Sequence, residues 1–182
     1  KRLNIWTQQE SRWLDLGLWD QNNIRPVGEE EFAGRACFGG IDLSAVSDMT
    51  VWTLLFPDPA DKDQLHVLAR VWCPEARLHD TKNKYRAQYQ AWKRQGYLMT
   101  TDGDAIDYDF IRAKIVEDAL KFDVDSISVD RLFQGYEFAM KLNEDLGGSE
   151  KAPKVYPCGM GHMSMAGPCL EMERLLLERK LN

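Results

Sequence analysis

The sequence predicts an α/β fold with one mixed sheet, in which a three-stranded antiparallel meander continues into parallel strands flanked by helices. Three β-type segments follow one another over residues 36–72 with only short turns between them. After residue 83 the apolar residues take up helical spacing, and helices then alternate with short strands. This alternation indicates parallel neighbours joined by right-handed crossovers.

The meander is predicted from segments rich in β-branched and aromatic residues, a composition that suits strands. These segments cover residues 36–43, 49–56 and 65–72. Small and polar residues at 44–48 predict the first turn. The Pro-Asp-Pro sequence within 57–63 predicts the second.

The second half is predicted to alternate helices with short extended pieces. The expected helices are 83–95, 107–121, 133–146 and 168–181, and the expected extended pieces are 98–100, 126–130 and 154–156. Gly96 and the Gly147-Gly148 pair are typical helix stops. Asp104 or Asp107 is expected to cap the start of the helix that follows it.

Length and composition suit one domain of 182 residues with enough hydrophobic residues, 44%, to bury a core. The net charge of -6 argues against a generic basic nucleic-acid binder. It leaves open an enzyme that holds cations with carboxylates and touches DNA over a small area. No apolar run approaches the roughly 20 residues that cross a membrane, so no membrane partner is expected.

Residues 1–35 differ from the rest, with Trp6, Trp13 and Trp19 spaced between polar residues. The pattern fits either a linker that packs on a neighbouring surface or an ordinary N-terminal helix and loop. The chain begins with Lys1 and ends at Asn182 directly after a helix-like run. We therefore expect a piece of a longer polypeptide, with one domain over 36–182.

Two aspartates are the leading candidates for chemistry. Asp42 closes the first strand and Asp130 closes the strand at 126–130. Sites in open α/β sheets form at such carboxyl ends, and a divalent cation offsets the cost of a poorly solvated carboxylate. Asp48, across the turn, either reaches the same pocket or satisfies turn amides. The competing interpretation, that each aspartate only caps a turn or helix, remains open from the residues alone.

Other motifs are weaker. The acidic cluster at 102–109 does not fit the calcium-loop template, no His-x-x-x-His or zinc-protease spacing occurs, and no P-loop is present, so no ATP site is expected. The four cysteines form no Cys-x-x-Cys pair, which disfavours a zinc ribbon. The aromatic and basic residues of 84–94 indicate either core packing with a solvated basic face or a nucleic-acid contact.

Several ordered motifs resemble the nuclease domain of tailed-phage large terminase subunits. They are residues 38–57 (FGGIDLSAVSDMTVWTLLFP), the segment 101–107, Val129-Asp130-Arg131 and the earlier Leu3-Asn4-Ile5-Trp6. The resemblance implies an RNase H-like fold and a Mg²⁺- or Mn²⁺-dependent endonuclease that cuts concatemeric double-stranded phage DNA at packaging. It also implies the infected host's cytoplasm as location, and the portal protein, the small terminase subunit and an ATPase domain of the same polypeptide as partners.

The same resemblance implies roles for individual residues. Asp42 would bridge two metal ions and Asp130 would hold one, with Arg131 as a DNA contact. The family takes a third acidic ligand from a later helix, expected beyond Asn182, and residues 1–35 would be the segment leaving the ATPase motor. Two carboxylates supply too few ligands for two ions. We therefore expect weak or single metal occupancy and low activity of this chain.

Two alternatives remain open at this stage. One keeps the fold but makes the enzyme an RNase H-like nuclease of the resolvase or transposase type. The other is a non-catalytic module that docks on the portal or the motor, with Trp6, Trp13 and Trp19 as its interface.

Overall fold

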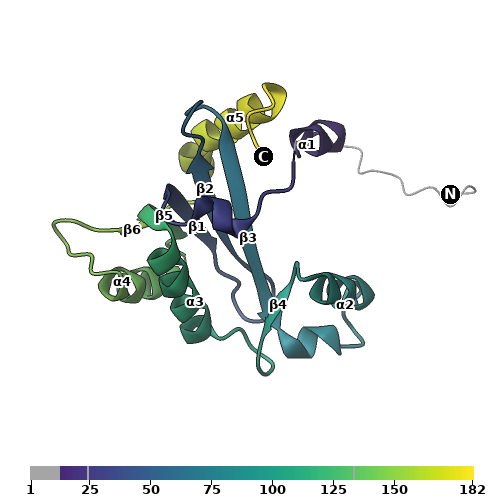
Figure 1. Ribbon diagram of the computed structural model, residues 1–182. Helices are drawn as coiled ribbons and strands as arrows, with labels where there is room; N and C mark the ends of the chain where they lie inside the picture. The colour runs from purple at the N-terminus through teal and green to yellow at the C-terminus, as the bar shows by residue number, and fades with distance from the viewer. Residues whose placement is uncertain (1–12, 24, 133) are drawn as a thin grey trace, which may run out of the picture.

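The computed structural model describes residues 13–23, 25–132 and 134–182, and its centre is a six-stranded mixed sheet of order β4-β3-β2-β1-β5-β6 (Figure 1). The strands are β1 (Ala36–Asp42), β2 (Thr50–Pro57), β3 (Leu65–Pro74), β4 (Met99–Thr101), β5 (Asp123–Asp130) and β6 (Val155–Cys158). The helices are α1 (Leu16–Asn22), α2 (Arg86–Gln95), α3 (Tyr108–Lys121), α4 (Gly135–Asp145) and α5 (His162–Leu177), with 3₁₀ turns η1 (Glu29–Phe32) and η2 (Glu75–Leu78). The predicted α/β mixed sheet is thus confirmed.

The meander β1-β2-β3 is antiparallel, and the strands added on both sides of it are parallel to their neighbours. β2 shows why the sheet forms here, because its residues alternate strictly between buried and half-buried positions. That period of two is the pattern of a strand with one face against a core. β1 pairs with β5 between residues 87 or 88 positions apart in the chain, and so joins the meander to the parallel half of the sheet.

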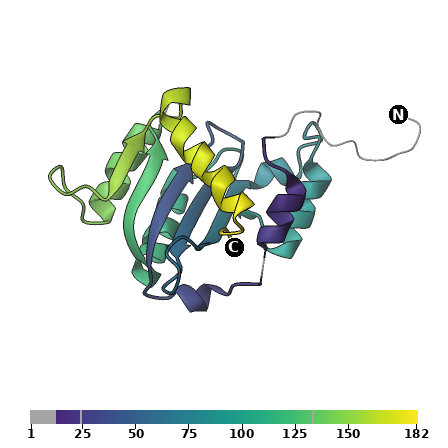
Figure 2. The ribbon, with the colours of Figure 1, turned by 90° about the horizontal axis from the view of Figure 1, so that it is seen from above.

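Helices cover both faces of the sheet unequally. α3 and α4 lie together on one face, and α5 crosses the other face (Figures 1 and 2). The main core lies between the sheet and the α3–α4 layer, and its largest members are fully buried: Trp52, Trp72, Phe32, Phe56 and Phe122. The N-terminal half of α5 is mostly exposed, so the face beneath it is covered more loosely.

A buried polar network ties this core together. Asp118 on α3 accepts a hydrogen bond from the Trp52 indole (2.9 Å) and two from the Arg70 guanidinium (2.6 and 2.7 Å). Arg70 also pairs with Glu29 of η1 at 2.8 Å. A charge-assisted network of this kind fixes α3 against β2 and β3.

A smaller lobe extends from the end of β3. Its residues 75–98 form η2, α2 and the turn into β4, around a second core of Cys73, Leu78, Tyr89 and Leu98. We call residues 75–98 the α2 lobe. Within the described ranges, no helix is long and apolar enough to cross a membrane.

Some predicted boundaries were wrong. α5 begins at His162, six residues before the expected start at Pro168, which lies inside the helix. Pro168 looked like a first-turn residue because proline has no N–H for an intrahelical bond. α2 begins at Arg86 rather than residue 83, since Asn83 forms a turn and its side chain accepts from Tyr85 N. β5 begins at Asp123, three residues early, because pairing with β1 extends it.

The N-terminal segment contains a short helix, α1, whose Asn22 is 3% exposed. The Asn22 amide donates to the carbonyl of Leu176 on α5 (3.0 Å) and accepts from Leu181 N (3.2 Å). Trp13 and Trp19 are 59% and 47% exposed, and Trp6 lies outside the described residues. Residues 16–22 are therefore bound to the end of α5, while Trp13 and Trp19 face outward.

Candidate metal centre

Asp42 and Asp130 come together at the ends of two neighbouring strands. β1 and β5 are parallel, and their register pairs Ile41 with Val129. Each aspartate is the next residue along its strand, so the two lie level at the same edge of the sheet. The sequence predicted this convergence only on condition that the strands were neighbours, and the structure fulfils that condition.

Both side chains face α5. Ile41 and Val129 are buried in the core on the α3–α4 side, and successive residues of a strand point to opposite faces. Asp42 and Asp130 accordingly line a cavity of about 560 Å³ between the sheet and the start of α5. Its other lining residues include Val51, Thr53, Ser128, Cys158, Met160, Ser164, Met165 and Pro168.

The negative charges of Asp42 and Asp130 are hardly neutralised by neighbouring side chains. Asp130 Oδ1 accepts one hydrogen bond, from Leu132 N at 3.0 Å, and neither aspartate forms an ion pair with a residue in the described part of the chain. Asp42 is exposed and Asp130 half-buried, and two like charges at neighbouring strand ends favour a cation between them. The pair therefore attracts positive charge into the cavity.

The donor set fits a hard divalent cation. Carboxylate and hydroxyl oxygens are the ligands that Mg²⁺ and Mn²⁺ prefer, and the cavity offers the two aspartates and the hydroxyls of Thr53, Ser128 and Ser164. Across residues 13–23, 25–132 and 134–182, no group of three His, Cys, Asp or Glu side chains is placed to hold an ion. The aspartate pair thus offers part of a coordination shell.

Gly135 fixes the position of Asp130 in a way that the sequence analysis missed. It is the first residue of α4, and a Cβ on it would lie 1.7 Å from the carbonyl oxygen of Asp130. Only glycine allows α4 to start this close to the end of β5. The sequence signal is a glycine five residues after the strand-end aspartate, which is recognisable only once the helix is placed.

The loop that follows Asp42 is held by side chains from distant segments. Thr50 Oγ1 accepts from Ser44 N at 3.0 Å, and both residues are buried. The Tyr108 hydroxyl, on α3, donates to the carbonyl of Ser44 and lies 3.3 Å from that of Ala45. Burial raises the pKa of Tyr108, so it stays protonated as a donor. Nothing in the sequence links Tyr108 to this loop, because the contact spans 64 residues.

Asp48 is not brought to the aspartate pair. It is exposed and does not line the cavity. It faces the α2 lobe instead: burial and then the charge of Asp48 raise the pKa of Tyr89. The loop between β1 and β2 is bonded to Tyr108 of α3 and to Ile106 N, and Asp48 stays outside the cavity despite its spacing of six residues from Asp42.

Arg131 lies at the rim of the cavity. Its backbone N–H donates to the carbonyl of Cys158 at 2.9 Å, and a Cβ placed on Gly159 would be 3.5 Å from its Nη2. The side chain is exposed and has no ion pair with the residues that the structure describes. Its guanidinium is thus available to a phosphate that enters the cavity.

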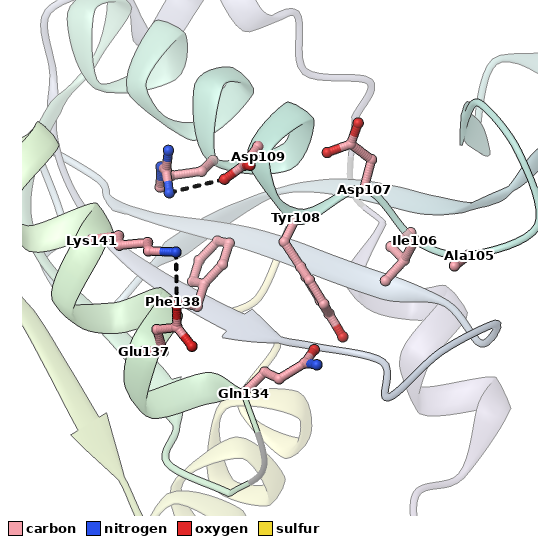
Figure 3. A pocket seen from close by; sticks show the side chains of 10 residues that line it. Ala105, Ile106, Asp107, Tyr108, Asp109, Gln134, Glu137, Phe138 and Lys141 are labelled. Atoms are coloured by element: carbon pink, nitrogen blue, oxygen red, sulfur yellow. Dashed lines mark ion pairs between the residues drawn. The ribbon is translucent and has the colours of Figure 1, made fainter.

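A second cavity, of about 470 Å³, lies between the starts of α3 and α4 (Figure 3). Its charged groups largely neutralise one another, since Glu137 pairs with Lys141 at 2.8 Å and Arg112 with Asp109 at 3.1 Å. Asp107 caps α3 by accepting from Phe110 N at 2.9 Å, as the sequence predicted. These pairings explain the polar lining as helix and interhelix structure.

Comparison with known proteins is consistent with this site. The chain matches the family model "Terminase large subunit, endonuclease domain" over residues 1–146. It is 32% identical over 129 residues to the terminase large subunit of Enterobacteria phage HK97, covering 71% of this chain and 24% of that protein. It is 31% identical over 117 residues to protein YmfN of Escherichia coli (strain K12), covering 61% of this chain and 26% of that protein. The chain thus spans about a quarter of the length of these relatives.

The fold is shared with a solved structure. The crystal structure of the HK97 bacteriophage large terminase superposes with a TM-score of 0.77 at 26% identity, over 94% of this chain and 34% of that one. The resemblance inferred from the sequence motifs and the fold that it implied are both confirmed. The chain belongs to the terminase large subunit endonuclease domain family.

Proposed function

We propose that this chain is a Mg²⁺- or Mn²⁺-dependent endodeoxyribonuclease domain that cuts concatemeric double-stranded phage DNA during genome packaging. The observation that carries the proposal is the placement of Asp42 and Asp130, side by side in one cavity of a terminase nuclease fold. The family supports nuclease activity on DNA. Metal dependence and the concatemeric substrate are the proposed refinements.

Asp42, Asp130 and Arg131 have separate roles in the proposed reaction. Asp42 and Asp130 would hold a divalent ion, which when bound supplies Lewis-acid activation of water and neutralises charge on the scissile phosphate. Arg131, at the rim, orients that phosphate through its guanidinium. The apolar lining from Met165 and Pro168 lowers the local dielectric and so strengthens these attractions.

The partners follow from the family. The substrate is double-stranded DNA, and the portal protein, the small terminase subunit and an ATPase domain of the same polypeptide are proposed partners in the cytoplasm of the infected host. Family membership favours this terminase role over the resolvase or transposase type that the residues alone left open.

Plasmid cleavage tests the proposal. Supercoiled DNA is incubated with Mg²⁺ or Mn²⁺ and this chain, as wild type or as Asp42→Asn, Asp130→Asn or Asp125→Asn. Asp125 is the matched control, because it is exposed on the same strand but does not line the cavity. We expect the first two variants to lose cleavage and the third to keep it. Normal cutting by Asp42→Asn or Asp130→Asn, with an unchanged fold, would contradict the proposal.

A non-catalytic docking role is a second candidate, favoured by the exposure of Trp19 on α1, which contacts α5, and of Trp13 just before that helix. Metal-dependent cleavage that is lost with Asp42→Asn decides for the nuclease. Binding to the portal or motor that is lost with Trp13→Ala and Trp19→Ala, without any metal-dependent cleavage, decides for docking.

A further inference from the structure

The α2 lobe concentrates positive charge in an acidic protein. Its 24 residues contain six Lys and Arg and two Asp and Glu, a net charge of +4, whereas the whole chain has -6. Both acidic residues are occupied inside the lobe, because Asp80 pairs with Arg77 (2.9 Å) and Glu75 with Lys93 (3.0 Å). The remaining cations are therefore not neutralised locally.

Four exposed cations remain: Lys82, Lys84, Arg86 and Arg94. None of them forms an ion pair with any residue of the described ranges. Three of the four gather before and at the first turn of α2, where the helix dipole disfavours positive charge. Stability of the lobe does not account for their placement.

Aromatic side chains accompany these cations. Tyr89 and Trp92 pack in or against the lobe's core, as the packing interpretation expected. Tyr85 and Tyr97 differ, with exposed fractions of 62% and 71%. Tyr hydroxyls and basic side chains both bind the phosphates and sugars of DNA. In the lobe, Tyr89 and Trp92 are packed, whereas Tyr85 and Tyr97 are exposed to solvent, as are the four cations.

The lobe starts at the same edge of the sheet as the aspartate pair. β3 is antiparallel to β2, and β2 is antiparallel to β1, so β3 ends at Pro74 on the edge where β1 and β5 end (Figure 1). Asp102 and Asp104 adjoin the lobe, since Ala76 N donates to the carbonyl of Gly103. These acids repel a phosphate backbone from that side, which leaves residues 82–86 as the contact.

We propose that the α2 lobe binds the phosphate backbone of duplex DNA beside the candidate cleavage site, through Lys82, Lys84 and Arg86 with Tyr85. The occupant follows from charge complementarity: an exposed cluster of cations without partners matches a polyanion. This inference rests on the proposed function for its substrate. It extends that function with a positioning surface that lies outside the metal cavity.

Binding of a fluorescent duplex by the 182-residue chain tests the surface. All variants carry Asp42→Asn and are measured in EDTA, so that no cleavage occurs, over about 50 to 200 mM salt. The lobe variant is Lys82→Gln/Lys84→Gln/Arg86→Gln. The matched control is Lys62→Gln/Lys151→Gln/Lys154→Gln, three exposed cations in loops at the opposite edge of the sheet.

Each phosphate contact contributes about 0.9 to the slope of log affinity against log salt. We therefore expect the lobe variant to bind about tenfold or more weakly at low salt and to lose 2 to 3 units of slope, approximately. The control should match the parent. If circular dichroism shows that the triple variant is unfolded, Lys82→Gln/Lys84→Gln, which leaves the helix itself unchanged, takes its place, with an expected loss of about 2 units of slope.

The proposed DNA-binding surface is wrong if the lobe and control variants bind with the same affinity and salt dependence. It is also wrong if the parent does not bind the duplex at the lowest salt. This result is separate from the nuclease proposal. If DNA binding depends on the lobe but the chain never cuts DNA, the binding surface stands and the nuclease proposal fails. If the chain cuts DNA but binds it independently of the lobe, the nuclease proposal stands and the binding surface fails.

Discussion

Gly135→Ala should disable the candidate site without touching a carboxylate. The added Cβ would lie 1.7 Å from the carbonyl oxygen of Asp130, whereas ordinary contacts begin at 3.4 Å. The end of β5 or the start of α4 must therefore shift by about 1.7 Å. Misplacing a catalytic group by about 1 Å costs on the order of 10²-fold in rate. The strain itself should cost about 1–3 kcal/mol of stability.

The assay is the rate of metal-dependent plasmid cleavage by the chain, with thermal unfolding measured in parallel. Gly167→Ala is the matched control, because a Cβ there meets nothing within 4 Å and its helix, α5, also borders the cavity. We expect cleavage to fall about 100-fold in Gly135→Ala and to stay unchanged in the control. A folded Gly135→Ala protein that cuts at the wild-type rate would refute the role given to this glycine.

Three further outcomes concern stability and thiol reactivity. Hydrogen bonds from Arg25 and from the Gly28 N–H lower the pKa of Glu31 to about 2 from 4.5. Because the pKa of Glu31 is lower in the folded state, the ionised carboxylate stabilises the folded protein above pH 4.5. That stabilisation is lost as the pH falls towards 2. Between pH 4.5 and 2, the melting temperature of wild type should therefore fall more steeply than that of Glu31→Gln. Equal slopes for the two proteins would contradict a stabilising Arg25–Glu31 pair. Burial raises the pKa of Cys37 to about 12, so a thiol reagent at pH 8 should label the half-buried Cys158 and spare Cys37 until the protein unfolds, as mass spectrometry of the native protein would show. Asn22→Ala leaves the Leu181 N–H without its partner and removes one of two hydrogen bonds to the Leu176 carbonyl, which also accepts from Arg179 N. It should lower the free energy of unfolding in urea by about 1–3 kcal/mol, and an unchanged midpoint would contradict this bond pattern.

The elements of the fold were predictable because their signals are local. Alternation over 49–56 and helical spacing over 107–121 gave β2 and α3 to within a residue or two. The start of α5 was not predictable, because its first turns contain Gly, Met and Pro in a pattern typical of a loop.

The candidate site was predictable in part. Asp42 and Asp130 were recognisable as strand-end carboxylates, and pairing of β1 with β5 brings them together. The roles of Gly135 and Tyr108 depend on contacts between segments that no periodicity reports. Asp48 illustrates the converse, because closeness in sequence placed it near Asp42 and the turn of the loop separates them. Metal binding by these residues stays a prediction.

Calorimetric titration of Mn²⁺ into the 182-residue chain tests most directly whether Asp42 and Asp130 form a metal-binding pair. Wild type, Asp42→Asn, Asp130→Asn and the control Asp125→Asn are compared at one pH and salt concentration. Because the pair supplies only part of a coordination shell, we expect weak binding of no more than one ion. That binding should vanish in the first two variants and persist in the third. Two tightly bound ions, or binding that survives Asp42→Asn, would contradict the assignment.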